Sequence, residues 1–535
     1  MTNLGENMKR KKLIKYILKI LSYLWLASLM VGLIIFLHQF FYLELDDDNG
    51  AEMILSKILA QRGGILRRDW YYSSELRVIN TQLIYSVLFR FCSDWHVVRL
   101  VGNAVMYLFL LAAVWYLCRE LHILKYYCVI AAMFMIPLSR DYYLFALHSA
   151  YLLPHLTLSI SLLAMYLHYV QAEKKSCRTC LAVLMGILSF FVGLGGIRHI
   201  IVFYLPLVCS GFFMVYQQRK EIFAKRLLDH RCIQSCLLAV SISIVAIFGF
   251  FINHLILKKI YYFSNYLSHD SFFCTIHAEN VERTINGWLN VYGYQEGNSI
   301  FSLYLICNML PAIILLLLFL ACKKAFEKNY YNVQESVLIT FWGSGVFFLS
   351  ILFVFSTMWY EERYIMPISV FAFPLMFVVF DKLKIVERLK NILVLCFAVL
   401  LTLCAGTNYK SYAEMDTSQE TRIVSDILLE NGYYNGYSFM FWKFGDCLTE
   451  YSNGQIEVWK KIYDTGTAFN EETLHRNKRW LEDMNHDTQI PTGKVFVILE
   501  EPIDVLDEGE ILYHSESIIV YGYNGYDALC RDIDG

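Results

Sequence analysis

Leu43-Glu-Leu-Asp-Asp-Asp-Asn49 places three consecutive carboxylates directly after an apolar run that covers residues 13–41. A run of this length exceeds the roughly 20 residues that a helix needs to cross a bilayer. It ends in bulky aromatic residues and has no small-residue cleavage site, which favours a retained membrane helix over a signal peptide. Asp46, Asp47 and Asp48 are therefore expected at the mouth of a membrane helix, where carboxylates are costly unless they reach water or have a function.

The composition extends this interpretation to the whole chain. Of 535 residues, 57% are hydrophobic and only 18% are charged. These values predict a mainly α polytopic membrane protein in contact with membrane lipids. A net charge of -2 gives no basic field and argues against nucleic acid as a partner.

Apolar segments of membrane-spanning length recur along the chain and predict about eleven transmembrane helices. They cover residues 13–41, 97–118, 126–139, 152–171, 179–196, 198–217, 232–257, 301–322, 337–356, 365–380 and 391–406.

Lysines and arginines gather in alternate loops, beginning with Lys9–Lys12 in the N-terminal residues 1–12. The positive-inside rule therefore puts the N-terminus in the cytoplasm and makes residues 13–406 a multi-pass domain of the cell membrane. On this topology three larger segments lie outside the cytoplasm, namely residues 42–96, residues 258–300 and the C-terminal tail 407–535.

The outer segments contain elements of their own. Residues 51–60 have apolar side chains at helical spacing and end at Gly63-Gly64, and residues 79–91 are also amphipathic, so both predict helices in the membrane interface. The polar and aromatic segment 258–300 suits a cap over a cavity. The tail is expected to form a small extracytoplasmic α/β domain. Its predicted elements are helices over 417–430 and 471–484 and strands over 495–499 and 517–521.

The acidic cluster is the first candidate site. If the segment is extended, Asp46 and Asp48 point to one side and Asp47 points away. A carboxylate at the edge of a low-dielectric cavity has a raised proton affinity, which suits a general base for a hydroxyl group or a metal ligand. The alternative is a solvated acidic collar that ends the helix.

Two basic clusters fall on the same predicted face of the membrane. In Gly193-Leu-Gly-Gly-Ile-Arg-His199, a glycine turn beside Arg198 and His199 is able to hold an anionic head group, and the alternative is a tight hairpin anchored to lipid phosphates. Arg363 also suits phosphate binding, or alternatively an ion pair with Glu361 or Glu362.

The remaining clusters carry weaker signals. Arg140, Asp141 and His148 follow Pro137 in an outer loop, where a single histidine among aromatic residues is more often structural. Cys177-Arg-Thr-Cys180 has the spacing of redox or zinc sites, but no further ligands follow at suitable spacing. Cys447 and Cys530 lie in the tail, and the sequence leaves open whether they pair.

These motifs together resemble the polytopic GT-C glycosyltransferases, in particular the aminoarabinose and protein mannosyl transferase branch and its uncharacterised bacterial relatives. Asp46-Asp47 followed by Ala51-Glu52 and a glycine stop is similar to the acidic motif and first interfacial helix of that branch. The sequence Arg363-Tyr-x-x-Pro367 before a late span adds to the resemblance, as do Gly195-Gly-Ile-Arg198 and the tail stretch Leu448–Ile456.

The resemblance implies an inverting transferase of the bacterial cell envelope. Its donor is a polyprenyl-phosphate sugar and its acceptor is an extracytoplasmic glycan, lipid or protein. Asp46, or Asp47, is then the general base. Arg198, His199 and Arg363 bind the donor phosphate, and Glu75 and Arg77 position the acceptor. The motifs establish no cofactor, and they leave open a divalent cation at Asp46 and Asp48 that the spacing does not indicate.

Two other classes are compatible with the composition. A transporter or flippase for lipid-linked glycans also needs basic residues near a cavity, but transporters often have repeated halves and charges near the bilayer midplane. A non-catalytic membrane scaffold would present the tail to a partner, and it would not need Asp46–Asp48 beside interfacial helices.

Overall fold

The computed structural model describes residues 2–219, 231–263, 278–295, 304–325, 327, 330–355, 361–440, 442–463, 468–503 and 505–534. The chain forms two compact units. The first unit contains Met1–Phe36, Ala104–Phe251 and His269–Tyr412, and the second contains Leu37–Asn103, Ile252–Ser268 and Ala413–Gly535. Residues 264–277 and 296–300 of the expected cap lie outside the described ranges, whereas its helix α12 (Ala278–Asn290) is described.

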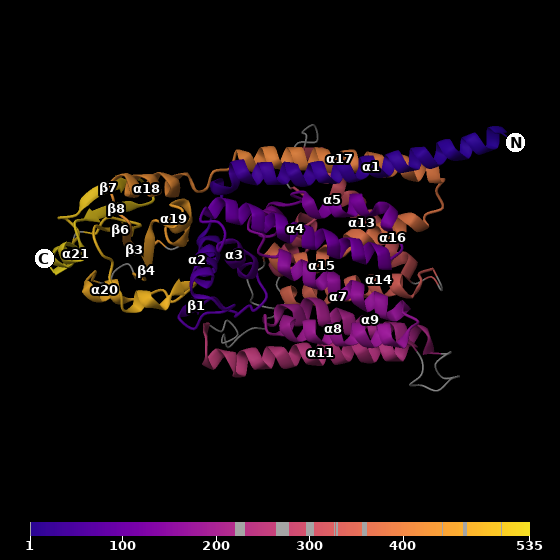
Figure 1. Cartoon of the computed structure of the whole chain (residues 1–535), viewed down its shortest axis with the longest axis horizontal. Helices are drawn as coiled ribbons and strands as arrows, with labels where there is room; N and C mark the ends of the chain where they lie inside the picture. Colours follow the sequence, from indigo (N-terminus) through magenta and orange to yellow (C-terminus); the bar gives the residue numbers. More distant parts are fainter. Residues whose placement is uncertain are drawn as a thin grey trace. The chain divides into compact units, whose positions relative to one another are not determined.

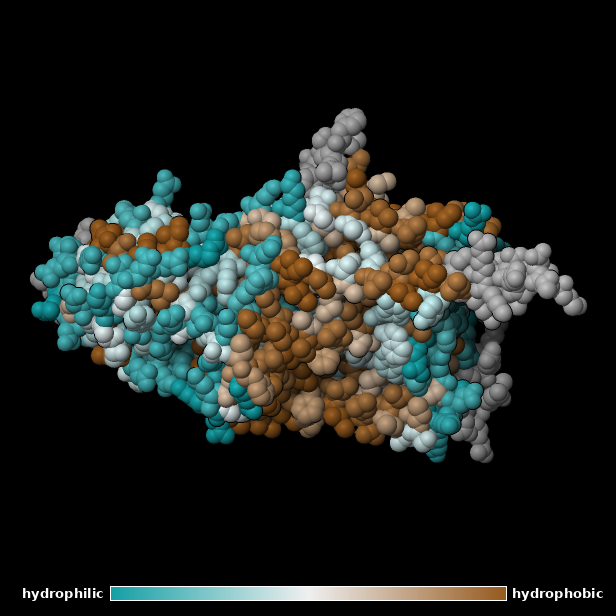
Figure 2. Space-filling model, turned by 45° about the horizontal axis from the view of Figure 1, so that its top comes forward, coloured by the Kyte–Doolittle hydropathy of each residue, from teal (hydrophilic) through white to brown (hydrophobic). Residues whose placement is uncertain are grey.

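Nine helices within the described ranges are long and apolar enough to cross a membrane. They comprise α1 (Thr2–Phe40), α4 (Trp95–Glu120), α7 (Leu153–Gln171), α8 (Lys175–Gly193), η4 with α9 (Ile200–Tyr204 and Leu205–Gln217), α11 (Arg231–Leu255), α13 (Tyr304–Ala325), α14 (Val333–Val354) and α17 (Glu387–Ala413). Large apolar side chains are exposed along them, including Phe109, Phe248 and Phe319, and hydrophobic surface gathers over these helices in Figure 2. Because such a surface is stable only against lipid, the polytopic architecture expected from the sequence is confirmed.

Two of the eleven expected spans, residues 126–139 and 365–380, do not form a single straight helix that crosses the membrane. Residues 126–139 form α5 (Tyr127–Met135), which meets the following α6 and η3 (Arg140–Tyr142 and Tyr143–His148) at 93° and adds a tenth candidate if the bent pair is one span. Pro137 stands at the bend, where it cannot continue a helical hydrogen-bond ladder. The carbonyl of Pro137 instead accepts a hydrogen bond of 2.6 Å from Asn408 Nδ2 of α17.

Residues 365–380 form two short helices, α15 (Met366–Ser369) and α16 (Ala372–Lys382). The 11 residues of α16 rise only about 16 Å, roughly half the thickness of a hydrocarbon core. All residues from 365 to 379 are buried, so this apolar stretch packs inside the first unit. An apolar run alone does not distinguish a buried helix from a lipid-facing one, which explains the difference from the prediction.

Tight helix packing holds the first unit together. In α14, Gly345 lies against Ile368 of α15, and Ser210 of α9 donates a hydrogen bond of 3.3 Å to the carbonyl of Val337 in α14. Figure 1 shows α1 and α17 running side by side, and Trp25 Nε1 of α1 bonds Thr402 Oγ1 of α17 at 3.0 Å. The first unit is therefore a packed helical bundle.

The C-terminal part of the second unit is an α/β structure around a five-stranded sheet in the order β4-β3-β6-β8-β7. Its strands are β3 (Asn435–Ser438), β4 (Glu457–Lys460), β6 (Val495–Leu499), β7 (Glu510–His514) and β8 (Ile519–Tyr523). Strand β3 runs parallel to β4 and β6, whereas β8 is antiparallel to β6 and β7. Helices α18 (Gln419–Glu430), α19 (Asp446–Tyr451) and α21 (Tyr526–Asp534) complete it.

The expected helix over 417–430 and the strand over 495–499 are confirmed by α18 and β6. The helix expected over 471–484 is wrong beyond its first turn, because α20 covers only Glu471–His475 and β5 (Glu482–Asp483) follows. Arg479 and Leu481 have positive φ values of 54° and 50°, which a continuing right-handed helix does not allow.

Strand β5 pairs with β1 (Trp70–Tyr72), which also pairs with β2 (Tyr262–Phe263) in a sheet of order β2-β1-β5. Three stretches that are far apart in the sequence therefore build the second unit. The same unit contains the helices α2 (Asp47–Arg62) and α3 (Gln82–Leu88), at the places where residues 51–60 and 79–91 predicted them.

Candidate active site

The acidic cluster forms the beginning of α2. Asp46 has extended backbone angles, and its Oδ1 accepts a hydrogen bond of 2.8 Å from the backbone N–H of Asn49, which makes Asp46 the N-cap. Asp47 and Asp48 lie in the first turn, where the helix dipole favours negative charge. The expected extended geometry, with Asp46 and Asp48 on one side, is therefore wrong because the helix begins four residues before the predicted start. Gly63, with φ of 77°, ends α2 as expected.

Asp46 combines a fixed backbone with an accessible carboxylate. Asp46 is exposed to solvent, and neighbouring protein still desolvates its carboxyl group. Desolvation by that protein, followed by the charge of Asp48, raises the pKa of Asp46 to about 7. A base with a pKa near the working pH is the most effective proton acceptor in catalysis.

Asp47 has a different environment. It is buried, and its Oδ1 accepts hydrogen bonds of 3.2 Å from the backbone N–H groups of both Gly445 and Cys447 at the start of α19. Burial, together with the charge of Asp446, raises the pKa of Asp47 well above that of an exposed carboxyl. Asp47 therefore anchors α19, whereas Asp46 is exposed and Asp48 is partly exposed.

A buried ion pair between α4 and α19 contacts the start of α2. Arg99 donates two hydrogen bonds of 2.7 Å to the carboxylate of Glu450, and both side chains have 0% exposure. Arg99 Nη2 also donates a hydrogen bond of 2.8 Å to the carbonyl of Asn49. The sequence reasoning missed this pair, although an arginine inside the apolar run 97–118 is the kind of residue that marks a functional position.

The expected acceptor-positioning residues lie in the same unit. Arg77 is buried, and its Nη2 lies 3.5 Å from Glu75 Oε2. Glu52 of α2 is close enough for the charges of Arg99 and Arg77 to act on it, although desolvation prevails and raises its pKa to about 7. Glu52 Oε2 is buried and has no hydrogen-bond partner among the described residues. Glu52, which the sequence motifs included only as part of Ala51-Glu52, is therefore an acidic group with a buried oxygen close to Arg99 and Arg77.

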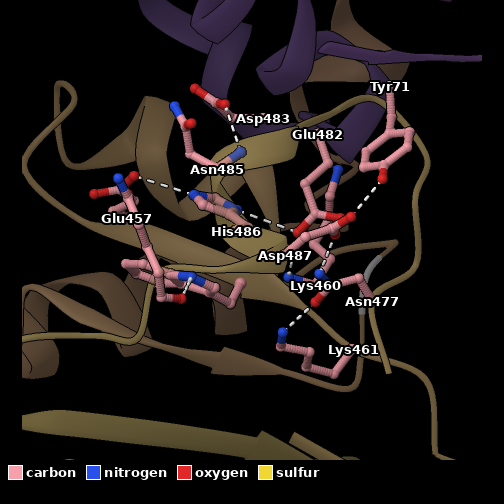
Figure 3. A network of polar contacts seen from close by, with 12 residues as sticks. Tyr71, Glu457, Lys460, Lys461, Asn477, Glu482, Asp483, Asn485, His486 and Asp487 are labelled. Atoms are coloured by element: carbon pink, nitrogen blue, oxygen red, sulfur yellow. Dashed lines mark hydrogen bonds and ion pairs between the residues drawn. The ribbon is translucent and has the colours of Figure 1, made fainter. Parts of the chain in front are cut away.

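A polar network in the tail links β4 and β5 to β1 (Figure 3). His486 lies between two carboxylates, with Nδ1 3.2 Å from Glu482 Oε1 and Nε2 3.1 Å from Glu457 Oε1. Although burial lowers the proton affinity of the ring, these two hydrogen bonds prevail and raise the pKa of His486 to about 9. Tyr71 of β1 donates a hydrogen bond of 2.5 Å to Asp487 Oδ2.

The same network reaches the acidic cluster. Lys460 Nζ forms a buried ion pair with Asp446, and its backbone N–H donates a hydrogen bond of 3.1 Å to Glu482 Oε1. A small cavity of about 10 Å³, near the space of one water molecule, is lined by Asp47, Asp48, Trp442, Lys460, Lys478 and Trp480. The polar core of the tail therefore continues to the start of α2.

In the first unit, the structure brings Arg198 and Arg363 to one aromatic ring although 165 residues separate them (363 − 198). Their guanidinium carbons lie 5.3 Å and 5.4 Å from the ring centre of Tyr364. Arg198 Nη1 is buried without a hydrogen-bond partner among the described residues. Arg363 forms an ion pair with Glu361, as the alternative interpretation of that motif expected.

His199 and the glycine turn contribute less than the sequence suggested. The His199 ring is buried and stacks on His155, with ring centres 4.4 Å apart. The N–H groups of Gly195 and Gly196 donate to the carbonyls of Val192 and Gly193 at 3.0 Å and 3.3 Å, so this turn bonds to itself. The anion-binding capacity of the motif therefore rests on the side chain of Arg198.

An open cavity of about 390 Å³ lies in the first unit and is lined by Asp141, Arg283, Asn286, Gly287, Asn290, Glu361 and Glu362. Desolvation and the nearby charge of Asp141 raise the pKa of Glu362 to about 7. His148 of the same sequence cluster is fully buried against Tyr143, with ring centres 5.5 Å apart, which agrees with a structural role.

Metal and disulfide chemistry receive no support from the described side chains. Within the described ranges, no three His, Cys, Asp or Glu residues are arranged to hold a metal ion, at Asp46 and Asp48 or at Cys177 and Cys180. Cys447 and Cys530, which the sequence left open as a pair, do not form a disulfide with each other.

The fold described above is shared with two solved structures of ArnT. The structure is similar to that of ArnT from Cupriavidus metallidurans bound to undecaprenyl phosphate, with a TM-score of 0.56 at 10% sequence identity over 94% of this chain and 97% of that chain. The apo state of the same ArnT gives a TM-score of 0.55 at 10% identity, again over 94% and 97% of the two chains.

An oligosaccharyltransferase from Archaeoglobus fulgidus, crystallised with Zn and sulfate, matches with a TM-score of 0.47 at 12% identity over 90% of this chain and 68% of that chain. No protein-family model matches the sequence, and no curated protein matches it in a sequence search.

Proposed function

We propose that this protein is a membrane glycosyltransferase that moves a sugar from a polyprenyl-phosphate donor to an acceptor hydroxyl outside the cytoplasm. The observation that carries the proposal is the accessible carboxylate of Asp46, fixed at the start of α2 in a fold shared with ArnT. The ArnT structure contains undecaprenyl phosphate, which supports a lipid-phosphate donor. The acceptor is a glycan, lipid or protein of the cell envelope.

In the proposed reaction, Asp46 takes the proton of the acceptor hydroxyl as its oxygen attacks the anomeric carbon of the donor sugar. The new glycosidic C–O bond forms while the bond between the anomeric carbon and the phosphate oxygen breaks. The lipid phosphate leaves with the electron pair, and a single displacement inverts the anomeric centre. Since the pKa of Asp46 is raised to about 7, transfer is expected to decline as the pH falls below about 7.

Arg198 and Arg363 are the proposed phosphate-binding residues of the first unit. The buried Nη1 of Arg198, which has no partner among the described residues, supports this role, because a guanidinium is well suited to hold phosphate oxygens. Negative charge grows on the leaving phosphate in the transition state, so cations at this position would accelerate the reaction. His199 remains a proposed phosphate-binding residue next to Arg198 in the sequence, and its buried ring stacks on His155.

Glu75 and Arg77 are proposed to position the acceptor, as the sequence suggested, and we add Glu52 to this group. The buried Oε2 of Glu52 is available to accept a hydrogen bond from a bound hydroxyl group. The N-terminus is proposed to lie in the cytoplasm and the residues after α17 outside it, on the evidence of the positively charged loops.

The test measures sugar transfer in membranes that contain full-length protein and a radiolabelled polyprenyl-phosphate sugar. Asp46→Asn is expected to lower transfer about 100-fold to 10,000-fold, the usual contribution of a general base. The matched control is Asp426→Asn on the exposed face of α18, which should transfer at the wild-type rate.

Asp47→Asn is expected to keep most of the activity, because the introduced side-chain amide would still present an oxygen to the backbone N–H groups of Gly445 and Cys447. Equal transfer by wild type and Asp46→Asn would contradict the proposed base. Movement of the intact lipid-linked sugar across the bilayer, with no new glycosidic bond, would instead identify a flippase.

A further inference from the structure

The short helix α19 contacts the acidic cluster at several points. The amides of Gly445 and Cys447 bind Asp47, Glu450 binds Arg99, and Gly50 of α2 packs directly on the Asp446 carbonyl. We infer that α19 is a positioning element of the active site, in which Glu450 acts through Arg99 and Asn49 to fix the orientation of Asp46. This inference rests on the proposed role of Asp46 and gives the C-terminal tail a part in catalysis.

The connection from Glu450 to Asp46 is continuous. Both carboxylate oxygens of Glu450 accept hydrogen bonds from Arg99, which holds the planar guanidinium in one orientation. The same guanidinium binds the carbonyl of Asn49 at 2.8 Å. The N–H of Asn49 donates to Asp46 Oδ1 at 2.8 Å, so Asn49 is held from both sides.

A second tether runs through Asp47. Its Oδ1 accepts the amides of Gly445 and Cys447, and the Cys447 thiol donates to it at 3.0 Å. Gly50 permits the helices to come this close, since a Cβ at that position would lie 2.5 Å from the Asp446 carbonyl carbon. Asp47 and Asn49, which follow Asp46 at the start of α2, are therefore both held by contacts that lead to the same six-residue helix.

The ion pair is better suited to orientation than to stability. A buried ion pair often contributes no more stability than apolar side chains of the same volume, because both charges lose their hydration. Arg99 and Glu450 have 0% exposure, so this cost applies in full. What apolar side chains at these positions would not supply is the directed hydrogen bond to the Asn49 carbonyl.

The charges around Asp46 give the inference a distinctive signature. Asp46 is influenced by Asp48 of α2, by Arg99 of α4 and by Glu450 of α19. Arg99 favours the ionised form of Asp46, whereas Asp48 and Glu450 oppose it. Removing Arg99 or Glu450 should therefore move the proton affinity of the base in opposite directions, which a general loss of folding does not do.

The experiment compares the pH dependence of kcat for full-length protein purified in lipid nanodiscs, with a polyprenyl-phosphate sugar as donor. Glu450→Gln is expected to move the acid limb of kcat to lower pH, and Arg99→Met to higher pH, each by about 0.5 to 1 pH unit. Both should lower kcat at the optimum about 10-fold to 100-fold and leave the KM of the donor unchanged. The control Glu430→Gln, on the exposed end of α18, should match wild type.

Conservative variants keep the inference testable if these substitutions prevent folding. Glu450→Asp and Arg99→Lys retain both charges and lose the bidentate geometry, so kcat should fall with the acid limb in its wild-type position. If the variants lower only the amount of folded protein, with wild-type kcat and pH profile per folded molecule, the positioning role is wrong. If Asp46→Asn transfers sugar at the wild-type rate, the proposed function itself fails, which is a separate outcome.

Discussion

Replacing Arg99 by methionine is expected to destabilise the second unit strongly. The substitution leaves the Glu450 carboxylate at 0% exposure without its two hydrogen bonds of 2.7 Å, and it leaves the Asn49 carbonyl without its donor. Breaking a buried pair from one side typically costs about 3–5 kcal/mol, because a charge stays buried without compensation. A similar loss is expected for Glu450→Met, which leaves the guanidinium unpaired.

The double variant Arg99→Met/Glu450→Met should recover much of this loss. It contains no unpaired charge, and the remaining cost is the unsatisfied carbonyl of Asn49, about 1–3 kcal/mol. The two single changes therefore should not add, and the cycle of four proteins measures their coupling. The assay is urea unfolding of the purified full-length protein in detergent micelles, followed by tryptophan fluorescence.

A partly exposed ion pair of the same unit provides the control. Arg62 and Asp69 are 44% and 33% exposed at 3.1 Å, so Arg62→Met should change the free energy of unfolding by no more than about 1 kcal/mol. The reasoning would be refuted by an Arg99→Met protein as stable as wild type. It would also be refuted by a double variant that loses the full sum of the two single effects.

Three further predictions follow from other contacts. Burial raises the pKa of Asp47 above the value of about 4 that it has in an unfolded chain. Between these two pKa values the native state holds a proton that the unfolded state releases. The stability of the wild type should therefore fall relative to that of Asp47→Asn as the pH rises from the unfolded to the folded pKa. Urea titrations of both proteins at several pH values check this, and a pH-independent difference would count against it. Gly50→Ala should destabilise the protein by about 1–3 kcal/mol, because the added Cβ would overlap the α19 backbone. The control is Gly406→Ala, which should not destabilise the protein because no atom beyond its own helix backbone lies within 4 Å of the added Cβ. Thermal unfolding of the two variants checks the difference. Tyr364→Leu removes the ring beside Arg198 and Arg363 and should raise the KM of the polyprenyl-phosphate donor about 2-fold to 30-fold in the transfer assay, with an unchanged KM as the contradicting result.

Local properties of the chain were sufficient to predict a polytopic membrane protein and several of its helices and strands. The apolar runs predicted the membrane bundle, because length and composition alone decide whether a helix can cross a bilayer. Gly63-Gly64 predicted the end of α2, since the positive φ of 77° at Gly63 is a conformation that favours glycine. The short apolar run Val495–Leu499 was likewise sufficient to predict β6.

Tertiary structure alone decided the environments of the acidic residues. Asp46 and Asp47 are neighbours with the same chemistry, yet Asp46 reaches solvent and Asp47 is buried against Gly445 and Cys447, which lie 398 and 400 residues away. The partner of Arg99 is 351 residues distant, so no local pattern indicates it.

The same reason explains why residues 365–380 were expected to span the membrane, since surrounding helices and not the segment itself determine whether an apolar helix faces lipid or protein. Sequence periodicity determines which face of an element is apolar, whereas burial and charge depend on what the fold packs against that face. For that reason the sequence identified Asp46–Asp48 as the candidate site, and only the packing of α19 on α2 distinguished the proposed base from its anchor.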